Sequence, residues 1–151
     1  MIVPTLEKPV RSNTALASEL RTSVMRLRRR LASERQPDNP LGMPAMAVLG
    51  ALYARGEMSV GELAAHERVQ PPSMTRTINC LEEGGYVARR PHESDGRQVV
   101  VAIEPKGRET VDADRMRRDA WLATRLRALS ADERAVLRQA APILERLARS
   151  D

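Results

Sequence analysis

With 151 residues, the chain has the length of one domain with a full hydrophobic core, and its net charge of +5, mostly from arginine, suits phosphate or carboxylate partners. Its only cysteine, Cys80, excludes an internal disulfide, and no Cys/His cluster has metal-site spacing, so we expect a reduced, cytoplasmic protein without cofactors. No apolar stretch approaches the roughly 18 residues of a membrane-spanning helix, and the first residues lack the form of a signal peptide, so we expect neither membrane insertion nor secretion.

The first predicted helix follows a loose arm. Residues 1–11 carry two prolines and no hydrophobic period, which indicates a segment without regular structure. From Asn13 onward, apolar residues recur at helical spacing, and this seam consists of Leu16, Leu20, Val24, Leu27 and Leu31. The helix must bury the seam against another surface. The prolines of "ERQPDNP" end it.

Two further helices are predicted next. The segment "LGMPAMAVLGALYARG" is nearly all apolar and closes with Gly56, which indicates a helix at the centre of the core. Ser59 and Glu62 have the spacing of a capping box, in which each side chain bonds a free backbone N–H at the start of a short helix. The polar segment "ERVQ" that follows has the length of a turn.

A fourth helix follows this turn. Pro71 and Pro72 begin it, because a missing N–H costs nothing in the first turn, and Gly84-Gly85 ends it. Its apolar residues Met74, Ile78 and Leu81 fall within about 60° of one another around the helix axis. The polar outward face carries Arg76, Asn79 and Glu83, with Thr75 on its flank.

A hairpin and two helices complete the chain. The β-branched runs "YVARRP" and "RQVVVAIE" are joined by a turn rich in Ser, Asp and Gly, which predicts two antiparallel strands. One helix is predicted from about Lys106 to Leu129, and a last one opens with a capping box at Ser130 and Glu133. We expect Pro142 to kink or divide this last helix. Its apolar stripe consists of Val136, Leu137, Ala140, Ile143, Leu144 and Leu147.

A short capped helix, a turn, a helix with a polar outer face and a basic hairpin together indicate a winged helix-turn-helix. The second helix fits the major groove, its first turn is expected to offer free N–H groups to phosphate, and the hairpin can place a cation in the minor groove. We expect Arg89 and Arg90 to bind phosphate and Arg97 to enter the groove. Asp95 is expected to hold the Arg97 guanidinium in a fork-type pair.

The segments "SVGELAAHERVQPPSMTRTINCLEEGGYVARR" and "DGRQVVVAIEPKGRE" resemble the MarR family of transcriptional regulators. The likeness runs in motif order from about Leu41 to Val111, although Asp-Gly-Arg stands where Asp-Arg-Arg is commoner and Ile103-Glu104 where Leu-Thr is usual. The resemblance implies that Asp95 and Arg97 form the wing pair. The residues that match the family's recognition-helix positions are Ser73, Thr75, Arg76 and Asn79.

The resemblance also implies a homodimer in which the first helix and the last two interlock, and a near-palindromic operator. We therefore expect a mainly α fold of about six helices with a small β-hairpin. The predicted division of the chain is an arm at 1–11, a dimerisation helix and loop at 12–40, a DNA-binding domain at 41–105 and C-terminal dimerisation helices at 106–151.

Two functions from different classes remain open. The first is a homodimeric repressor on double-stranded DNA, released by a small apolar or phenolic ligand that shifts the population away from the DNA-binding arrangement. The second is a winged-helix module that uses its basic surface on acidic protein partners. No catalytic set or phosphate loop is visible, which argues against an enzyme.

Five further residues have a core-packing interpretation, and for four of them a functional alternative exists. Trp121, Tyr53, Met43 and Met46 could line an effector pocket between the DNA-binding and dimerisation regions, but core packing explains them as well. Cys80, on the helix that begins at Pro71, is expected to be a small packing residue.

Overall fold

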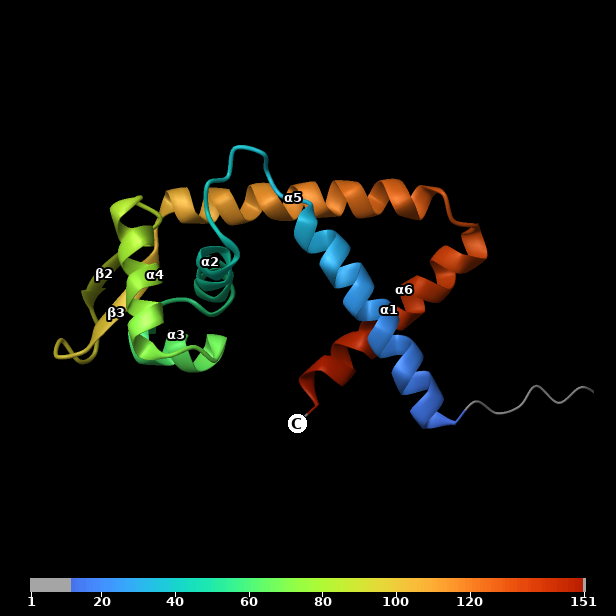
Figure 1. Ribbon diagram of the computed structural model, residues 1–151, viewed down its shortest axis with the longest axis horizontal. Helices are drawn as coiled ribbons and strands as arrows, with labels where there is room; N and C mark the ends of the chain where they lie inside the picture. Colours follow the sequence, from blue (N-terminus) through green and yellow to red (C-terminus); the bar gives the residue numbers. More distant parts are fainter. Residues whose placement is uncertain (1–11, 151) are drawn as a thin grey trace, which may run out of the picture. The chain divides into compact units, whose positions relative to one another are not determined.

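The computed structural model describes residues 12–150, which form six helices and a three-stranded antiparallel sheet (Figure 1). The arm predicted for residues 1–11 lies outside the described residues. The chain separates into two compact units, divided between Glu34 and Arg35. Over residues 12–150, none of the helices combines the length and the apolarity needed to cross a bilayer.

The first unit contains helix α1 (Asn13–Ser33). Ser12 caps it by accepting a hydrogen bond from the backbone N–H of Ala15 at 3.3 Å, which satisfies one of the free donors of the first turn. The predicted seam lies on this helix, but none of its residues is buried; Leu20, for example, is 37 % exposed.

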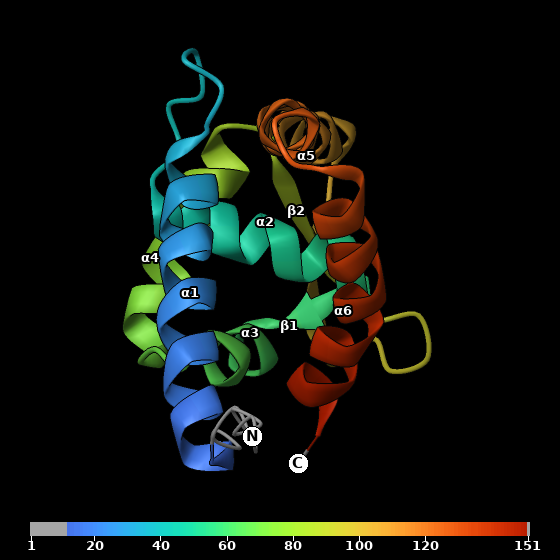
Figure 2. The ribbon, with the colours of Figure 1, turned by 90° about the vertical axis from the view of Figure 1, so that its right-hand side faces the viewer.

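The core of the second unit forms around α2 (Met43–Arg55), which contacts the neighbouring helices and the sheet. Figure 2 shows α2 crossing beneath α5, which is seen end-on. α2 ends at Gly56 with φ 85°, a left-handed conformation that glycine adopts without strain. Leu49 and Leu52 are fully buried, as the apolar composition predicts.

The predicted helix-turn-helix is present as α3 (Val60–Glu67) and α4 (Pro71–Glu83). In the capping box of α3, Ser59 Oγ accepts the Glu62 N–H at 3.1 Å, and Glu62 Oε2 accepts the Ser59 N–H at 2.7 Å. The turn is one residue shorter than predicted, because Glu67 still belongs to α3. The inward residues of the two helices are buried: Leu63, Ala64, Met74, Ile78 and Leu81.

The hairpin consists of β2 (Val87–Pro91) and β3 (Val99–Ile103), with Arg89 paired to Val101. β1 (Met58–Ser59) adds a third strand along β3, which the sequence did not predict. A two-residue strand is too short to show an alternating pattern, so only the pairing partner defines it. Figure 1 shows the hairpin beside α4, with the loop that joins β2 and β3 projecting beyond the strands.

Two helices follow the hairpin, α5 (Pro105–Arg127) and α6 (Ala131–Arg149). The second capping box is formed as predicted, since Ser130 Oγ accepts the Glu133 N–H at 3.1 Å. α6 runs without interruption through Pro142, so the predicted alternative of a divided helix was wrong. α6 buries none of its residues.

Candidate nucleic-acid interface

The outward face of α4 carries the side chains predicted to read DNA. Ser73, Thr75, Arg76 and Asn79 are all exposed. The hydroxyl of Thr75 donates to the carbonyl oxygen of Pro71 at 3.0 Å, which limits its rotation. The Arg76 guanidinium has no partner among residues 12–150, so its five N–H donors are free for a ligand.

The first turn of α4 differs from the expectation. Pro71 and Pro72 carry no N–H, and the N–H of Ser73 donates to the carbonyl oxygen of Gln70 at 3.0 Å. The prediction that these residues offer free N–H groups to phosphate was therefore wrong. The proline pair stabilises the start of the helix and removes the donors that would have bound an anion there.

Arg89 lies on β2 and points back to α4. Its Nη1 donates to Glu82 Oε1 at 3.0 Å and its Nη2 donates to Asn79 Oδ1 at 2.7 Å. Glu82 also accepts the backbone N–H of Arg89 through Oε2 at 3.0 Å. The first strand of the wing is thereby attached to the last two turns of the helix by both a side chain and the backbone.

Arg90, the next residue, forms a different ion pair. Its Nε and Nη2 donate to Glu57 Oε2 at 2.9 and 2.6 Å. The Glu57 carboxylate raises the pKa of the Arg90 guanidinium, because it accepts these hydrogen bonds and attracts the charge. Both arginines that the sequence assigns to phosphate therefore already hold a carboxylate.

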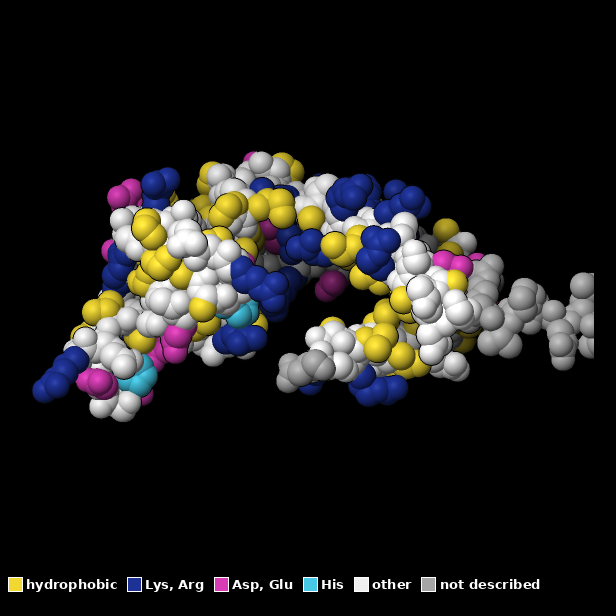
Figure 3. Space-filling view, turned by 60° about the horizontal axis from the view of Figure 1, so that its bottom comes forward, with side chains coloured by type: hydrophobic (Ala, Val, Ile, Leu, Met, Phe, Trp, Pro, Cys, Tyr) yellow, Lys and Arg dark blue, Asp and Glu magenta, His cyan; other side chains and the backbone are white. Residues whose placement is uncertain are grey.

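The wing tip is organised by its backbone. Asp95 Oδ1 accepts the N–H of Arg97 at 3.1 Å, and the carbonyl oxygen of Asp95 accepts the N–H of Gln98 at 3.0 Å. The predicted pair between Asp95 and the Arg97 guanidinium is not formed; the carboxylate shapes the turn instead. In Figure 3 the far end of the hairpin carries a basic side chain that extends into solvent.

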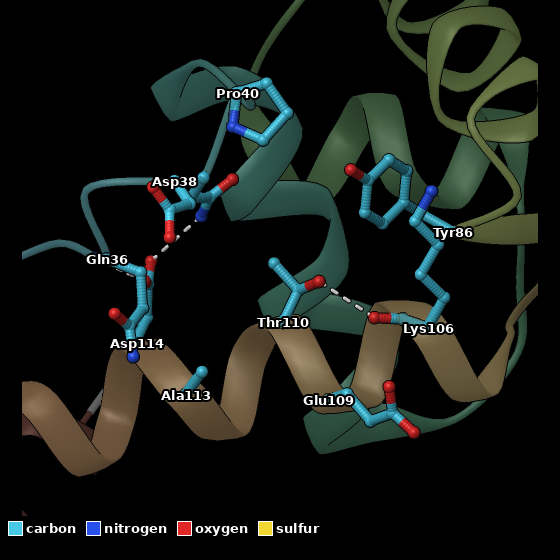
Figure 4. A pocket seen from close by; sticks show the side chains of 10 residues that line it. Gln36, Asp38, Pro40, Tyr86, Lys106, Glu109, Thr110, Ala113 and Asp114 are labelled. Carbon is cyan, nitrogen blue, oxygen red and sulfur yellow. Dashed lines mark hydrogen bonds between the residues drawn. The ribbon is translucent and has the colours of Figure 1, made fainter.

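A cavity of about 400 Å³ lies between the loop that precedes α2 and the first half of α5 (Figure 4). Its lining includes the aromatic ring of Tyr86, with the Lys106 ammonium 4.4 Å from the ring centre. The buried carboxylate of Asp114 accepts the Gln36 N–H at 3.1 Å and thereby holds the loop. None of the four residues predicted to line an effector pocket belongs to this cavity.

Two of the ambiguous residues now have a defined environment. The hydroxyl of Tyr53 donates to Asp112 Oδ1 at 2.6 Å, and the Arg115 guanidinium stacks 4.2 Å from the ring centre, so this tyrosine joins α2 to α5. Cys80 is exposed on α4, and the expectation of a packing role was wrong. At the border of the apolar face, the rotation of the helix turns the thiol toward solvent.

Comparisons with known proteins agree on one family. Residues 41–99 match the family model described as the MarR family. The chain is 45 % identical to an uncharacterised helix-turn-helix transcriptional regulator of Mycobacterium leprae over 133 residues, which cover 88 % of this chain and 92 % of that protein. A putative transcriptional regulator of Pseudomonas aeruginosa superposes with a TM-score of 0.83 at 34 % identity, covering 95 % of this chain and 99 % of that one.

Two more distant similarities are to a described repressor and to a protein with a bound ligand. A helix-turn-helix transcriptional repressor of Mycobacterium bovis is 35 % identical over 72 residues, which cover 46 % of this chain and 52 % of that protein. The MepR protein of Staphylococcus aureus, in a structure bound to ethidium bromide, has a TM-score of 0.63 at 17 % identity, covering 87 % of this chain and 95 % of that one.

The fold and the exposed basic hairpin define a winged helix-turn-helix protein of the DNA-binding class. The similarity over nearly the whole chain is specific: the protein belongs to the MarR family and is a DNA-binding transcriptional regulator. The family and the fold class predicted from the sequence are thus confirmed. Since this family consists of transcriptional regulators, the chain is not an enzyme, as predicted.

Sequence reasoning missed two residues that shape this interface. Glu82 and Glu57 each pair with a wing arginine, and neither was assigned a role. Glu82 precedes Arg89 by seven residues across a helix end and a glycine turn, and Glu57 precedes Arg90 by 33. No helical or strand period joins such positions, so only the folded chain reveals the pairs.

Proposed function

We propose that the protein is a homodimeric repressor that binds a near-palindromic operator in double-stranded DNA. The observation that carries this proposal is the combination of a complete winged helix-turn-helix with apolar helix faces that residues 12–150 leave uncovered. One winged helix-turn-helix can bind one half-site of an operator. A two-fold symmetric dimer presents two recognition helices about one DNA turn apart and therefore binds both half-sites.

In this proposal α4 lies in the major groove and the wing reaches the adjacent minor groove. Ser73, Thr75, Arg76 and Asn79 face the base edges and flanking phosphates, because they are the exposed polar residues of the helix. Arg97 enters the minor groove, where its guanidinium, which no residue of 12–150 pairs, meets concentrated negative potential. Asp95 fixes the turn that presents it.

The dimer would use the two apolar surfaces that lie outside the DNA-binding unit. α6 exposes a stripe of apolar side chains, which includes Ile143 and Leu144. On this helix Val136 is 63 % exposed and Leu147 is 59 % exposed. A row of large apolar side chains in contact with water is typical of a protein–protein interface. We assign residues 12–40 and 106–151 to dimerisation and 41–105 to DNA binding.

Repression and release by a ligand are supported by relatives. One relative is itself described as a repressor, and the structurally similar MepR has been seen with ethidium bromide bound. We propose that a small apolar or phenolic molecule binds the arrangement that is incompetent for DNA and so shifts the population away from the operator. Since the target is chromosomal DNA, the protein would act in the cytoplasm.

The test is selection from a pool of duplexes with a randomised central segment, followed by fluorescence anisotropy on the selected duplex and on a scrambled one. The expected result is one near-palindromic sequence, bound at least about 1,000-fold more tightly than the scrambled duplex at near-physiological salt. Equal weak binding to every duplex would contradict the proposal and favour a protein-interaction module with acidic partners.

A further inference from the structure

The ion pair between Glu82 and Arg89 occupies the position where a phosphate contact was expected. Three hydrogen bonds hold the two residues and Asn79 together: 3.0 and 2.7 Å from the guanidinium and 3.0 Å from the backbone N–H of Arg89. The Arg89 side chain is 27 % exposed and that of Glu82 is 41 % exposed, so the pair is partly shielded from solvent.

This pair is better held than its neighbour. Arg90 and Glu57 meet through a single carboxylate oxygen, and the arginine side chain is 57 % exposed. Exposed pairs of this kind contribute little, and a dense array of phosphates can compete for the arginine. Arg89, by contrast, has acceptors on two different side chains, Glu82 and Asn79, and its guanidinium must give up both to turn toward DNA. The backbone N–H of Arg89 also holds the Glu82 carboxylate in place.

The Glu82 carboxylate lies on the recognition helix and repels the DNA phosphates. Its presence there weakens DNA binding unless the carboxylate has another function. Every cation free to contact phosphate strengthens binding to any sequence equally, because phosphates carry no sequence information. A basic residue that is held by the protein contributes less to this general binding. Base readout by the rest of α4 then makes up a larger share of the affinity.

We propose that Glu82 is a specificity-determining positioning residue, which keeps Arg89 on the protein surface and out of contact with phosphate while the protein is bound to its operator. This inference rests on the DNA-binding function. In the bound state Arg89 joins the wing to α4, so that Arg76 and Arg97 reach DNA from one rigid unit. Withholding Arg89 lowers the affinity for DNA of any sequence, and it raises the ratio of operator binding to binding of other sequences.

The experiment compares Glu82→Gln with the wild type, using the selected duplex and a scrambled duplex over a fourfold range of salt. Glutamine keeps the size of the side chain and an acceptor for the Arg89 N–H, but it loses the charge that holds the guanidinium. The released arginine should then bind phosphate. We expect the slope of log affinity against log salt to steepen by about 0.9 per protomer. Over this range the additional loss of affinity is about 3.5-fold for one protomer and about 12-fold for a dimer on its operator.

A matched control separates release of Arg89 from simple loss of a negative charge. Glu83→Gln makes the same charge change at the next position of α4, where the carboxylate is exposed and has no partner among residues 12–150. It should raise affinity slightly without the added phosphate contact. The double variant Glu82→Gln/Arg89→Gln should return to the wild-type slope, since the effect acts through the arginine.

Arg89→Gln alone gives the direct test. If Glu82 withholds Arg89 from DNA, this variant keeps the wild-type salt slope, and its selectivity for the operator changes only through the loosened wing. A slope that becomes shallower by about 0.9 per protomer would show that Arg89 binds phosphate in the wild type and would overturn the inference. Equal effects of Glu82→Gln and Glu83→Gln would overturn it as well.

Thermal unfolding of each variant checks that the fold is intact before slopes are compared. The two proposals fail in different ways. If the wild-type protein selects no duplex, the repressor proposal fails at the first step. If it selects an operator but Glu82→Gln leaves the slope and the ratio of operator to scrambled binding unchanged, only the role of Glu82 is refuted.

Discussion

Asp95 Oδ1 accepts a hydrogen bond from the backbone N–H of Arg97 at 3.1 Å, while the Arg97 guanidinium has no partner among residues 12–150. The acid therefore acts on the conformation of the turn, and the arginine remains free for a ligand. An Asp side chain that bonds the N–H two residues ahead forms a turn of its own, which fixes the direction in which the following side chain leaves the hairpin.

This arrangement predicts different effects for two substitutions of Asp95. Asp95→Asn keeps the accepting oxygen and removes a negative charge near DNA, so operator affinity should match or slightly exceed that of the wild type. Asp95→Ala removes the acceptor and should weaken binding by about 0.5–1.5 kcal/mol, the net value of one hydrogen bond. Anisotropy on the selected duplex measures both. A loss with Asp95→Asn equal to that with Asp95→Ala would indicate that the carboxylate charge matters instead.

Arg97→Ala should weaken operator binding by about 1–3 kcal/mol if the guanidinium lies in the minor groove. Arg97→Lys should recover only part of this loss, because an ammonium group is more strongly hydrated and lacks the planar fork. Arg138→Ala serves as the control, since Arg138 is exposed on α6 and has no partner among the described residues. Equal effects of Arg97→Ala and Arg138→Ala would argue against a groove contact.

The proposed dimer predicts that a charge in the α6 stripe separates the protomers. Leu144 is 40 % exposed in the chain, and Leu144→Glu would place a carboxylate in the apolar interface. We expect sedimentation to report monomers and operator affinity to fall by at least about tenfold, because one half-site remains per molecule. Ala135→Glu, on the opposite side of α6, should leave both unchanged. A dimer that survives Leu144→Glu would place the interface elsewhere.

Gly107 is required by the close approach of α5 to the start of β2. A Cβ atom at this position would lie 2.4 Å from the carbonyl oxygen of Tyr86 and 2.8 Å from Ile103 Cγ1. Gly107→Ala should therefore lower the free energy of unfolding by about 1–3 kcal/mol, as overpacking does in other cores. Denaturant unfolding measures the change.

Gly50 provides the matched control for this substitution. It lies inside α2, and a Cβ atom there would meet nothing within 4 Å. Gly50→Ala should raise the free energy of unfolding by about 0.4–1 kcal/mol, because alanine loses less backbone entropy on folding. If the two glycine variants shift stability in the same direction, steric contact at Gly107 is not the cause.

The contact between Tyr53 and Asp112 predicts a dependence of stability on alkaline pH. Asp112 raises the pKa of the Tyr53 phenol above its ordinary value, because it accepts the phenolic hydrogen bond and repels the phenolate. The stabilising contribution is present below the ordinary tyrosine pKa of about 10 and is lost as the pH rises through the raised value.

Tyr53→Phe tests this dependence. The variant should be less stable than the wild type at about pH 8, and the difference should shrink as the pH rises to about 11. Denaturant midpoints at both values measure it, and the absorbance change of the phenolate identifies the titrating group. A difference that does not vary with pH would show that the hydrogen bond to Asp112 is not formed in solution.

Local rules determined the elements of this protein. The capping pairs at Ser59 and Ser130 and the proline start at Pro71 fixed where three helices begin, and each depends only on residues within one turn. The order of these elements and the basic hairpin predicted a winged helix-turn-helix, and the resemblance of two segments to known motifs added the MarR family. The outward positions of Thr75, Arg76 and Asn79 followed from helical periodicity, whereas the exposure of Cys80 did not.

Tertiary structure decided the environment of the charged groups. The sequence gives Arg89, Arg90 and Asp95 charges but no partners, because an ion pair depends on distances between residues that no period relates. Packing of β2 against the end of α4 brought Glu82 to Arg89, and pairing of β1 with β3 placed Glu57 near Arg90. Residue type determined which side chains could bind phosphate, and the folded chain determined which of them remain free to do so.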